Sequence, residues 1–93
     1  MELSHSGYHY TITLQNEFRM SECINFRNTY EKVPTNAALT LDFQSVKAID
    51  SSCVVMLMSL VQHFNNSEKV QIVNCSSDIT DLFSNTTICN WLH

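Results

Sequence analysis

The residues best suited to chemistry in this 93-residue chain lie together at Asp50-Ser51-Ser52. A serine beside an aspartate could serve as a nucleophile, with one of the four histidines completing a Ser, His and Asp set. A nucleophile elbow needs glycines around the serine so that it can occupy a strained turn, and none is present here. The chain also lacks a glycine-rich phosphate loop. We therefore predict no catalytic residues, and the tripeptide alone is best interpreted as a helix cap whose oxygens accept unpaired N–H groups.

Cysteine and histidine do not form a metal-ligand pattern in this sequence. The four cysteines are widely spaced, no two of them form a C-x-x-C pair, and the histidines stand apart from them. We predict no metal site and no cofactor. Free cysteine is commonly a small core residue, so the thiols are expected to be reduced and buried. The cysteines are Cys23, Cys53, Cys75 and Cys89.

The charge of the chain argues against nucleic-acid binding. The formal net charge is -4, and the five Lys and Arg residues are spread along the chain without a basic cluster. The longest strictly apolar run, Cys53 to Met58, is far shorter than the roughly 20 residues that cross a bilayer. Residues 1–6 show no basic segment followed by an apolar one, as a signal peptide would. We expect a cytoplasmic protein without membrane insertion.

Hydrophobic periodicity predicts three strands. Tyr8, Tyr10, Ile12 and Leu14 alternate with polar residues over 8–14, as in a strand with one buried face. Residues 38–43 repeat this pattern, and residues 70–73 give a third strand. In the second strand the residues expected on the buried face are Leu39, Leu41 and Phe43.

Three helices are expected between and after these strands. The first begins near Arg19 or Ser21 and is closed by Pro34. Its apolar positions at helical spacing are Met20, Cys23, Ile24 and Tyr30. The second begins at residues 50–52, and the third is capped by Ser76-Ser77-Asp78. The resulting β-α-β-α-β-α order predicts one α/β domain over residues 1–93, with a mostly parallel or mixed sheet and helices packed on it.

The second helix has two distinct faces on a helical wheel. Its expected core-facing residues are Cys53, Val54, Leu57, Leu60, Val61 and Phe64. A second stripe contains Ser51, Val55, Met58 and Gln62. An exposed apolar pair beside polar groups would form a protein-docking surface. The alternative, left open by the sequence, is that Val55 or Met58 packs against a neighbouring helix. His63 lies off the core stripe and is expected to be solvated, whereas Trp91 is expected to cover the core edge.

The stretch from Leu39 to Ser52 resembles the central signature of the STAS family, in which a buried strand and a short loop lead to Asp-Ser-Ser or Asp-Ser-Thr at the start of a helix. Residues 70–74 are similar to the next strand of the family, and residues 77–83 to its final helix. The likeness covers about residues 38–92. The sequence departs from the family where Cys53-Val54-Val55 replaces the usual Gly-Leu-Gly.

The resemblance implies a regulatory protein of the anti-sigma-factor antagonist type. Such proteins bind an anti-sigma factor with serine-kinase activity and are switched off when that kinase phosphorylates the serine after the aspartate. By this resemblance Ser51 is the phosphoacceptor, Ser52 an alternative site, and Asp50 a neighbouring contact. The expected partner-binding residues are Asp50, Ser51, Ser52, Val55, Met58 and Gln62. The alternative within the family is a subunit that docks on an ABC-type transporter ATPase without needing a phosphate.

Overall fold

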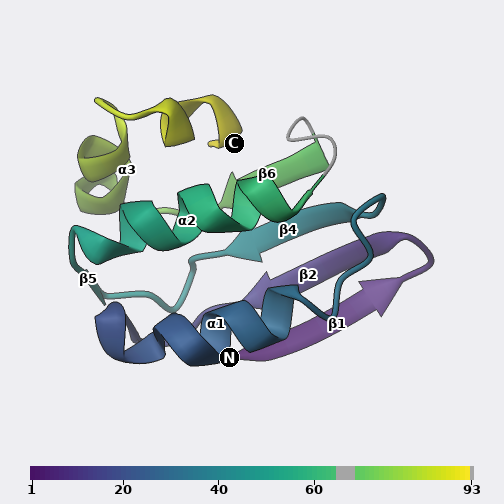
Figure 1. Cartoon of the computed structure of the whole chain (residues 1–93). Coiled ribbons are helices and arrows are strands. Elements are labelled where there is room, and N and C mark those ends of the chain that lie inside the picture. The colour runs from purple at the N-terminus through teal and green to yellow at the C-terminus, as the bar shows by residue number, and fades with distance from the viewer. Residues whose placement is uncertain (65–68, 93) are drawn as a thin grey trace.

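A mixed sheet forms the centre of the computed structural model, which describes residues 1–64 and 69–92 (Figure 1). Among these residues the sheet has four strands in the order β1-β2-β4-β6. They are β1 (Glu2–Ser6), β2 (His9–Thr13), β4 (Ala38–Asp42) and β6 (Val70–Val73). β2, β4 and β6 run parallel, whereas β1 is antiparallel to β2. The predicted α/β class with a mixed sheet is confirmed, and the three predicted strands correspond to β2, β4 and β6.

The first strand, β1, was not expected from the sequence. It forms a hairpin with β2 through the two-residue turn Gly7-Tyr8, and Gly7 has φ 60°. Positive φ at the first turn residue alone is typical of a type II′ turn, whose twist matches that of the strands. The prediction that Tyr8 lies on the buried face of a strand is wrong. Tyr8 is in this turn and is 74% exposed.

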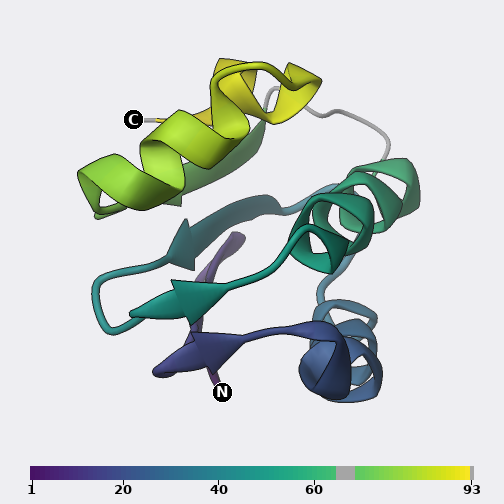
Figure 2. The same ribbon diagram turned by 90° about the vertical axis from the view of Figure 1, so that its left-hand side faces the viewer.

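Helices α1 (Cys23–Tyr30) and α2 (Ser52–His63) lie side by side on one face of the sheet (Figure 2). A short 3-10 turn, η1 (Met20–Glu22), precedes α1. α3 (Ser77–Phe83) and the 3-10 helix η3 (Thr87–Trp91) lie near the β6 end of the sheet, and Leu92 forms a parallel bridge with Ile72 of β6. No helix in the described ranges is long and apolar enough to cross a membrane.

The core lies between the sheet and its helices. Leu39, Leu41 and Phe43 are all buried, as the alternation in β4 predicts. Phenylalanine rings connect the elements, because Phe43 stacks edge-on against Phe18 and Phe83 with centroids 5.9 and 6.0 Å apart. Such offset ring pairs contribute beyond their buried area. Phe18 of β3 also packs edge-on against Phe26, with centroids 4.9 Å apart, and Phe26 lies in α1. Aromatic contacts therefore join α1, the sheet and α3.

The buried face of α1 includes only part of the apolar pattern noted in the sequence. Phe26 and Tyr30 are its buried residues, whereas Met20 and Ile24 are 61% and 74% exposed. Ile24 is two positions from Phe26, which places it about 200° around the helix and so on the opposite side. Met20 lies in the separate η1 turn. Of the four apolar positions noted at helical spacing, only Tyr30 is buried, because the packing of Phe26 sets the helix rotation.

A second, two-stranded parallel sheet positions the starts of η1 and α2. It pairs β3 (Glu17–Phe18) with β5 (Ala48–Ile49). The carbonyl oxygen of Asn16 accepts hydrogen bonds from the backbone N–H groups of Lys47 and Ala48, at 2.8 and 3.1 Å. Parallel pairing brings the ends of both strands to the same side. The segments that follow, η1 and the start of α2, consequently begin next to each other.

Candidate functional site

Ser51 is an exposed residue at the N-cap of α2, immediately after β5 and Asp50. The Ser51 side chain makes no capping hydrogen bond to the first turn of α2, and every residue of that turn is described by the structure. Asp50 performs the capping, because its Oδ1 accepts hydrogen bonds from the backbone N–H of Ser52, at 3.1 Å, and from the Ser52 hydroxyl. The sequence predicted that all three residues would cap the helix. The helix uses Asp50, so the Ser51 hydroxyl is not required for the fold of this turn.

The two candidate serines differ in their surroundings. Ser51 is exposed, whereas Ser52 is half-buried and its hydroxyl donates a hydrogen bond to Asp50. Its partial burial limits access to the Ser52 oxygen, and the hydrogen bond fixes the orientation of the hydroxyl. Of the two hydroxyls, that of Ser51 is the more accessible.

Hydrogen bonding keeps Asp50 charged over a wide pH range. The Ser52 hydroxyl is the main cause that lowers the pKa of the Asp50 carboxyl below its ordinary value of 3.8. The backbone N–H groups of Met20 and Ser52 and the positive charge of Arg19 act in the same direction. Met20 and Arg19 belong to the segment that the small β3–β5 sheet brings next to α2. A negative charge therefore lies beside Ser51 at neutral pH.

The predicted docking stripe of α2 is exposed along its length. Val55 and Met58 are 64% and 45% exposed, and Ser51 and Gln62 are exposed as well. The exposure of both apolar side chains favours the docking-surface alternative over burial against a neighbouring helix. On the opposite face Cys53, Leu57, Leu60 and Phe64 are buried, whereas Val54 and Val61 are half-buried. Met56 is buried too, so the inward face is rotated slightly toward α1 relative to the prediction.

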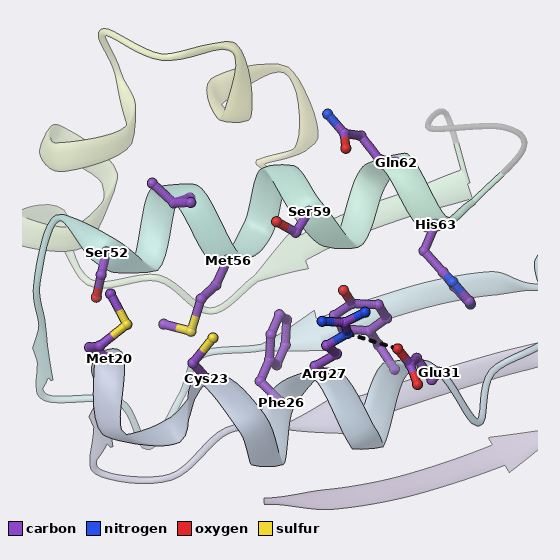
Figure 3. A pocket seen from close by; sticks show the side chains of 12 residues that line it. Met20, Cys23, Phe26, Arg27, Glu31, Ser52, Met56, Ser59, Gln62 and His63 are labelled. Atoms are coloured by element: carbon purple, nitrogen blue, oxygen red, sulfur yellow. Dashed lines mark hydrogen bonds and ion pairs between the residues drawn. The ribbon is translucent and has the colours of Figure 1, made fainter.

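A cavity of about 450 Å³ lies between α1 and α2, directly beside this stripe (Figure 3). Its end near Ser52 carries three sulfur-containing side chains, Met20, Cys23 and Met56. Its other end is polar and includes the Arg27–Glu31 ion pair, in which Nε and Oε1 are 2.9 Å apart. Ser52, Val55 and Gln62 contribute to both the cavity and the predicted docking residues. Sequence reasoning missed the cavity because its two walls come from different helices.

His63 closes the polar end of the cavity and is not the solvated residue that the sequence predicted. It is half-buried, and its ring packs against Tyr30 and Phe64 with centroid distances of 5.3 and 5.2 Å. Its Nε2 is buried without a hydrogen-bond partner among the described residues. The prediction failed because the last turn of α2 is covered by the end of α1. Trp91 is half-buried against the core, as predicted.

Comparison with known protein families matches residues 1–88 to the family described as "Mlab, STAS domain". The chain belongs to the STAS domain family. The unphosphorylated form of the anti-sigma factor antagonist SpoIIAA has a similar structure, with 16% sequence identity over 99% of this chain and 84% of that chain, and a TM-score of 0.77. The phosphorylated form of the Bacillus cell fate determinant SpoIIAA gives 15% identity over 99% and 87% of the two chains, with a TM-score of 0.66. No curated protein sequence matches the chain.

The STAS fold shows how the departure from the expected Gly-Leu-Gly pattern affects the helix surface. Cys53 is fully buried, and Val54 is half-buried against the core. Of the three residues, only Val55 is exposed. Relative to the Gly-Leu-Gly that the resemblance implies, the exposed helix surface therefore differs mainly by the side chain of Val55.

The thiols of this STAS domain follow the prediction of buried cysteine in part. Burial, with a smaller effect of the Asp50 carboxylate, raises the pKa of Cys53 to about 12. Burial also raises the pKa of half-buried Cys75 to about 11. Cys23 is half-buried in the cavity wall, and the side chain of Cys89 lies outside the described part of the chain. Among Cys23, Cys53 and Cys75, Cys53 is thus the thiol most strongly protected by the fold.

Proposed function

We propose that this STAS domain is a protein-binding regulatory module of the anti-sigma-factor antagonist type. Its partner docks on the exposed stripe of α2, and phosphorylation of Ser51 by a cognate serine kinase, which is itself the anti-sigma factor, releases that partner. The observation that carries the proposal is the exposed Ser51 at the head of the stripe, in a helix that Asp50 caps instead.

A phosphate on Ser51 would act on the partner interface more than on the domain. It adds a charge of about -1.5 to -2 at neutral pH. The start of α2 attracts this charge through its free N–H groups, whereas the ionised Asp50 repels it. Within an interface the partner must in addition desolvate a dianion where it met a hydroxyl. The isolated domain should keep its fold, because the Ser51 side chain makes no capping hydrogen bond to α2.

The apolar residues of the stripe supply binding energy next to the switch. Burying a whole valine or methionine side chain is worth about 1.5–3 kcal/mol. Since Val55 is 64% exposed, its burial by a partner would contribute about 1–2 kcal/mol, or roughly a 5- to 30-fold change in Kd. Met58 adds a smaller share, since it is 45% exposed. The cavity beside Val55 offers further apolar surface to the same partner.

The two similar solved structures support this proposal at the level of the fold. They are an anti-sigma factor antagonist without phosphate and a cell fate determinant of the same name with phosphate. Both share the arrangement of strands and helices that places a serine-bearing helix start at the surface here. The assignment of the same switch to Ser51 is our inference.

A second candidate function is constitutive docking on an ABC-type transporter ATPase. The exposed Val55 favours it, because an apolar side chain where the family usually has glycine gives a lasting contact that needs no phosphate. The match to the family described as "Mlab, STAS domain" is compatible with either function. The two candidate functions differ in whether phosphorylation of Ser51 controls partner binding.

The discriminating experiment is capture of partners from native cell extract with wild type, Ser51→Ala and Ser51→Asp, combined with intact-mass analysis for phosphate. Ser77→Asp is a matched control, since Ser77 is an exposed serine at the start of a different helix. We expect wild type, Ser51→Ala and Ser77→Asp to retain a kinase partner and Ser51→Asp to lose it. Equal recovery by all variants and an absence of phosphate would refute the switch. Recovery of an ABC ATPase by every variant would select the second candidate.

A further inference from the structure

The outer edge of β1 is unpaired in the described part of the chain. β1 pairs with β2 on one side only, and all its residues except Leu3 are exposed. The opposite edge of the sheet is different, because Leu92 bridges to Ile72 of β6. β1 therefore presents a row of backbone N–H and C=O groups to its surroundings.

The hairpin turn defines which groups of β1 point outward. In a hairpin with a two-residue turn, the residues that close the turn exchange both backbone hydrogen bonds, and hydrogen-bonded pairs then alternate along the strands. Ser6 and His9 close this turn, so Ser6, Ser4 and Glu2 direct their backbone groups toward β2. Leu3 and His5 consequently direct theirs outward.

This edge lacks the features that usually prevent strand pairing. Natural edge strands are protected by lysine, proline, a bulge or a covering segment. β1 contains neither lysine nor proline, and its register with β2 runs without interruption from Glu2 to Ser6. Its one charged residue is Glu2, at the end of the strand.

We propose that two copies of this chain associate by antiparallel pairing of their β1 strands about a two-fold axis at Ser4. In this register Leu3 faces His5 of the second copy, so the outward backbone groups of these two residues form hydrogen bonds with each other. Glu2 faces Ser6 of the second copy, which keeps the two carboxylates apart. The four-stranded sheets join into one continuous sheet, and the only symmetric pair is Ser4 with Ser4.

The charge pattern and geometry favour a second copy over another strand because the edge is complementary to itself. A two-fold antiparallel pair needs the same surface on both chains, and this register opposes no like charges. Strands of five residues bury less surface than a standard interface of about 1,600 Å², so we expect a weak dimer with a Kd on the order of 100 μM. Ser4 and the α2 stripe lie on different elements, and the proposal is independent of the Ser51 switch.

The test is sedimentation velocity of wild type, Ser4→Lys and Ser4→Glu at concentrations from about 10 μM to about 1 mM, a range that brackets the expected Kd. We expect wild type to shift from monomer to dimer over this range. Each variant alone should lose at least about tenfold in dimer affinity, because two like charges would lie directly opposite each other at position 4. A mixture of the two variants should recover dimers, because the charges at this position are then opposite. Ser45→Lys, in an exposed loop, is the matched control and should dimerise as wild type does.

Two outcomes would overturn the proposal. A wild-type protein that stays monomeric throughout this range has no such interface. Dimers that persist equally in both Ser4 variants must use another surface. Circular dichroism of each variant checks that the fold is retained, and His5→Pro provides a second readout because it removes an outward N–H without removing a bond to β2. His5→Ala, which keeps that N–H, should dimerise.

Discussion

Alkylation of Cys53 measures whether the start of α2 stays folded when Ser51 carries a negative charge. The side chain of Cys53 is fully buried, two residues beyond Ser51, and its pKa is raised to about 12 by burial. The thiolate is the reactive form. At pH 8 a thiol with a pKa of about 12 is ionised to roughly one part in 10⁴, against about one part in 10 for the ordinary value of 9.0. Ionisation alone therefore slows alkylation about 10³-fold.

The assay is timed alkylation with iodoacetamide, followed by peptide mass spectrometry, for wild type and Ser51→Asp. The urea-unfolded protein provides the reference rate for the same cysteine. We expect Cys53 to label at least about 10³-fold more slowly in the folded protein than in urea, with a similar rate in both variants. Rapid labelling in wild type would show that Cys53 is not buried in solution. Rapid labelling only in Ser51→Asp would refute a steric and electrostatic switch and indicate local unfolding.

Two further predictions concern the stability of the domain. The lowered pKa of Asp50 contributes stability that is present above its ordinary value of 3.8 and is lost as the pH falls through the lower pKa of the folded state. The Asp50→Asn variant should therefore lose less stability than wild type as the pH falls, as measured by thermal melts from about pH 6 to about pH 2. An acid profile identical to that of wild type would contradict this role of Asp50. Leu41→Ala, at a fully buried position of the central strand β4, should cost about 2–5 kcal/mol in urea unfolding, whereas exposed Gln71→Ala on neighbouring β6 should cost less than about 0.5 kcal/mol. Equal effects of these two substitutions would show that the core is misplaced.

The sequence predicts the parallel part of the sheet well because burial alternates there. Leu39, Leu41 and Phe43 share the buried face of β4, and Val70 and Ile72 do the same in β6. β1 escaped detection because an edge strand needs few buried side chains, and its stability comes from backbone pairing with β2. The β3–β5 pair is two residues long in each strand, which is too short for a periodic signal.

The candidate site was only partly predictable, because some of its features depend on contacts between distant parts of the chain. The exposure of Ser51, Val55 and Met58 follows from the rotation of one helix, which local periodicity reveals. The cavity and the burial of His63 depend on how α1 packs beside α2, a contact between distant parts of the chain. Capping by Asp50 rather than Ser51 was hidden as well, because all three residues at the helix start have suitable oxygens.

The measurement that tests the proposed switch most directly compares one purified partner binding to two forms of the domain. One form is unmodified, and the other carries phosphate quantitatively on Ser51, with Ser52 unmodified in both. The partner is the protein captured by wild type from native extract, and affinity is measured by titration calorimetry. We predict that the phosphate weakens binding by at least about tenfold while the circular dichroism spectrum stays the same. Equal affinities of the two forms would contradict the switch at Ser51.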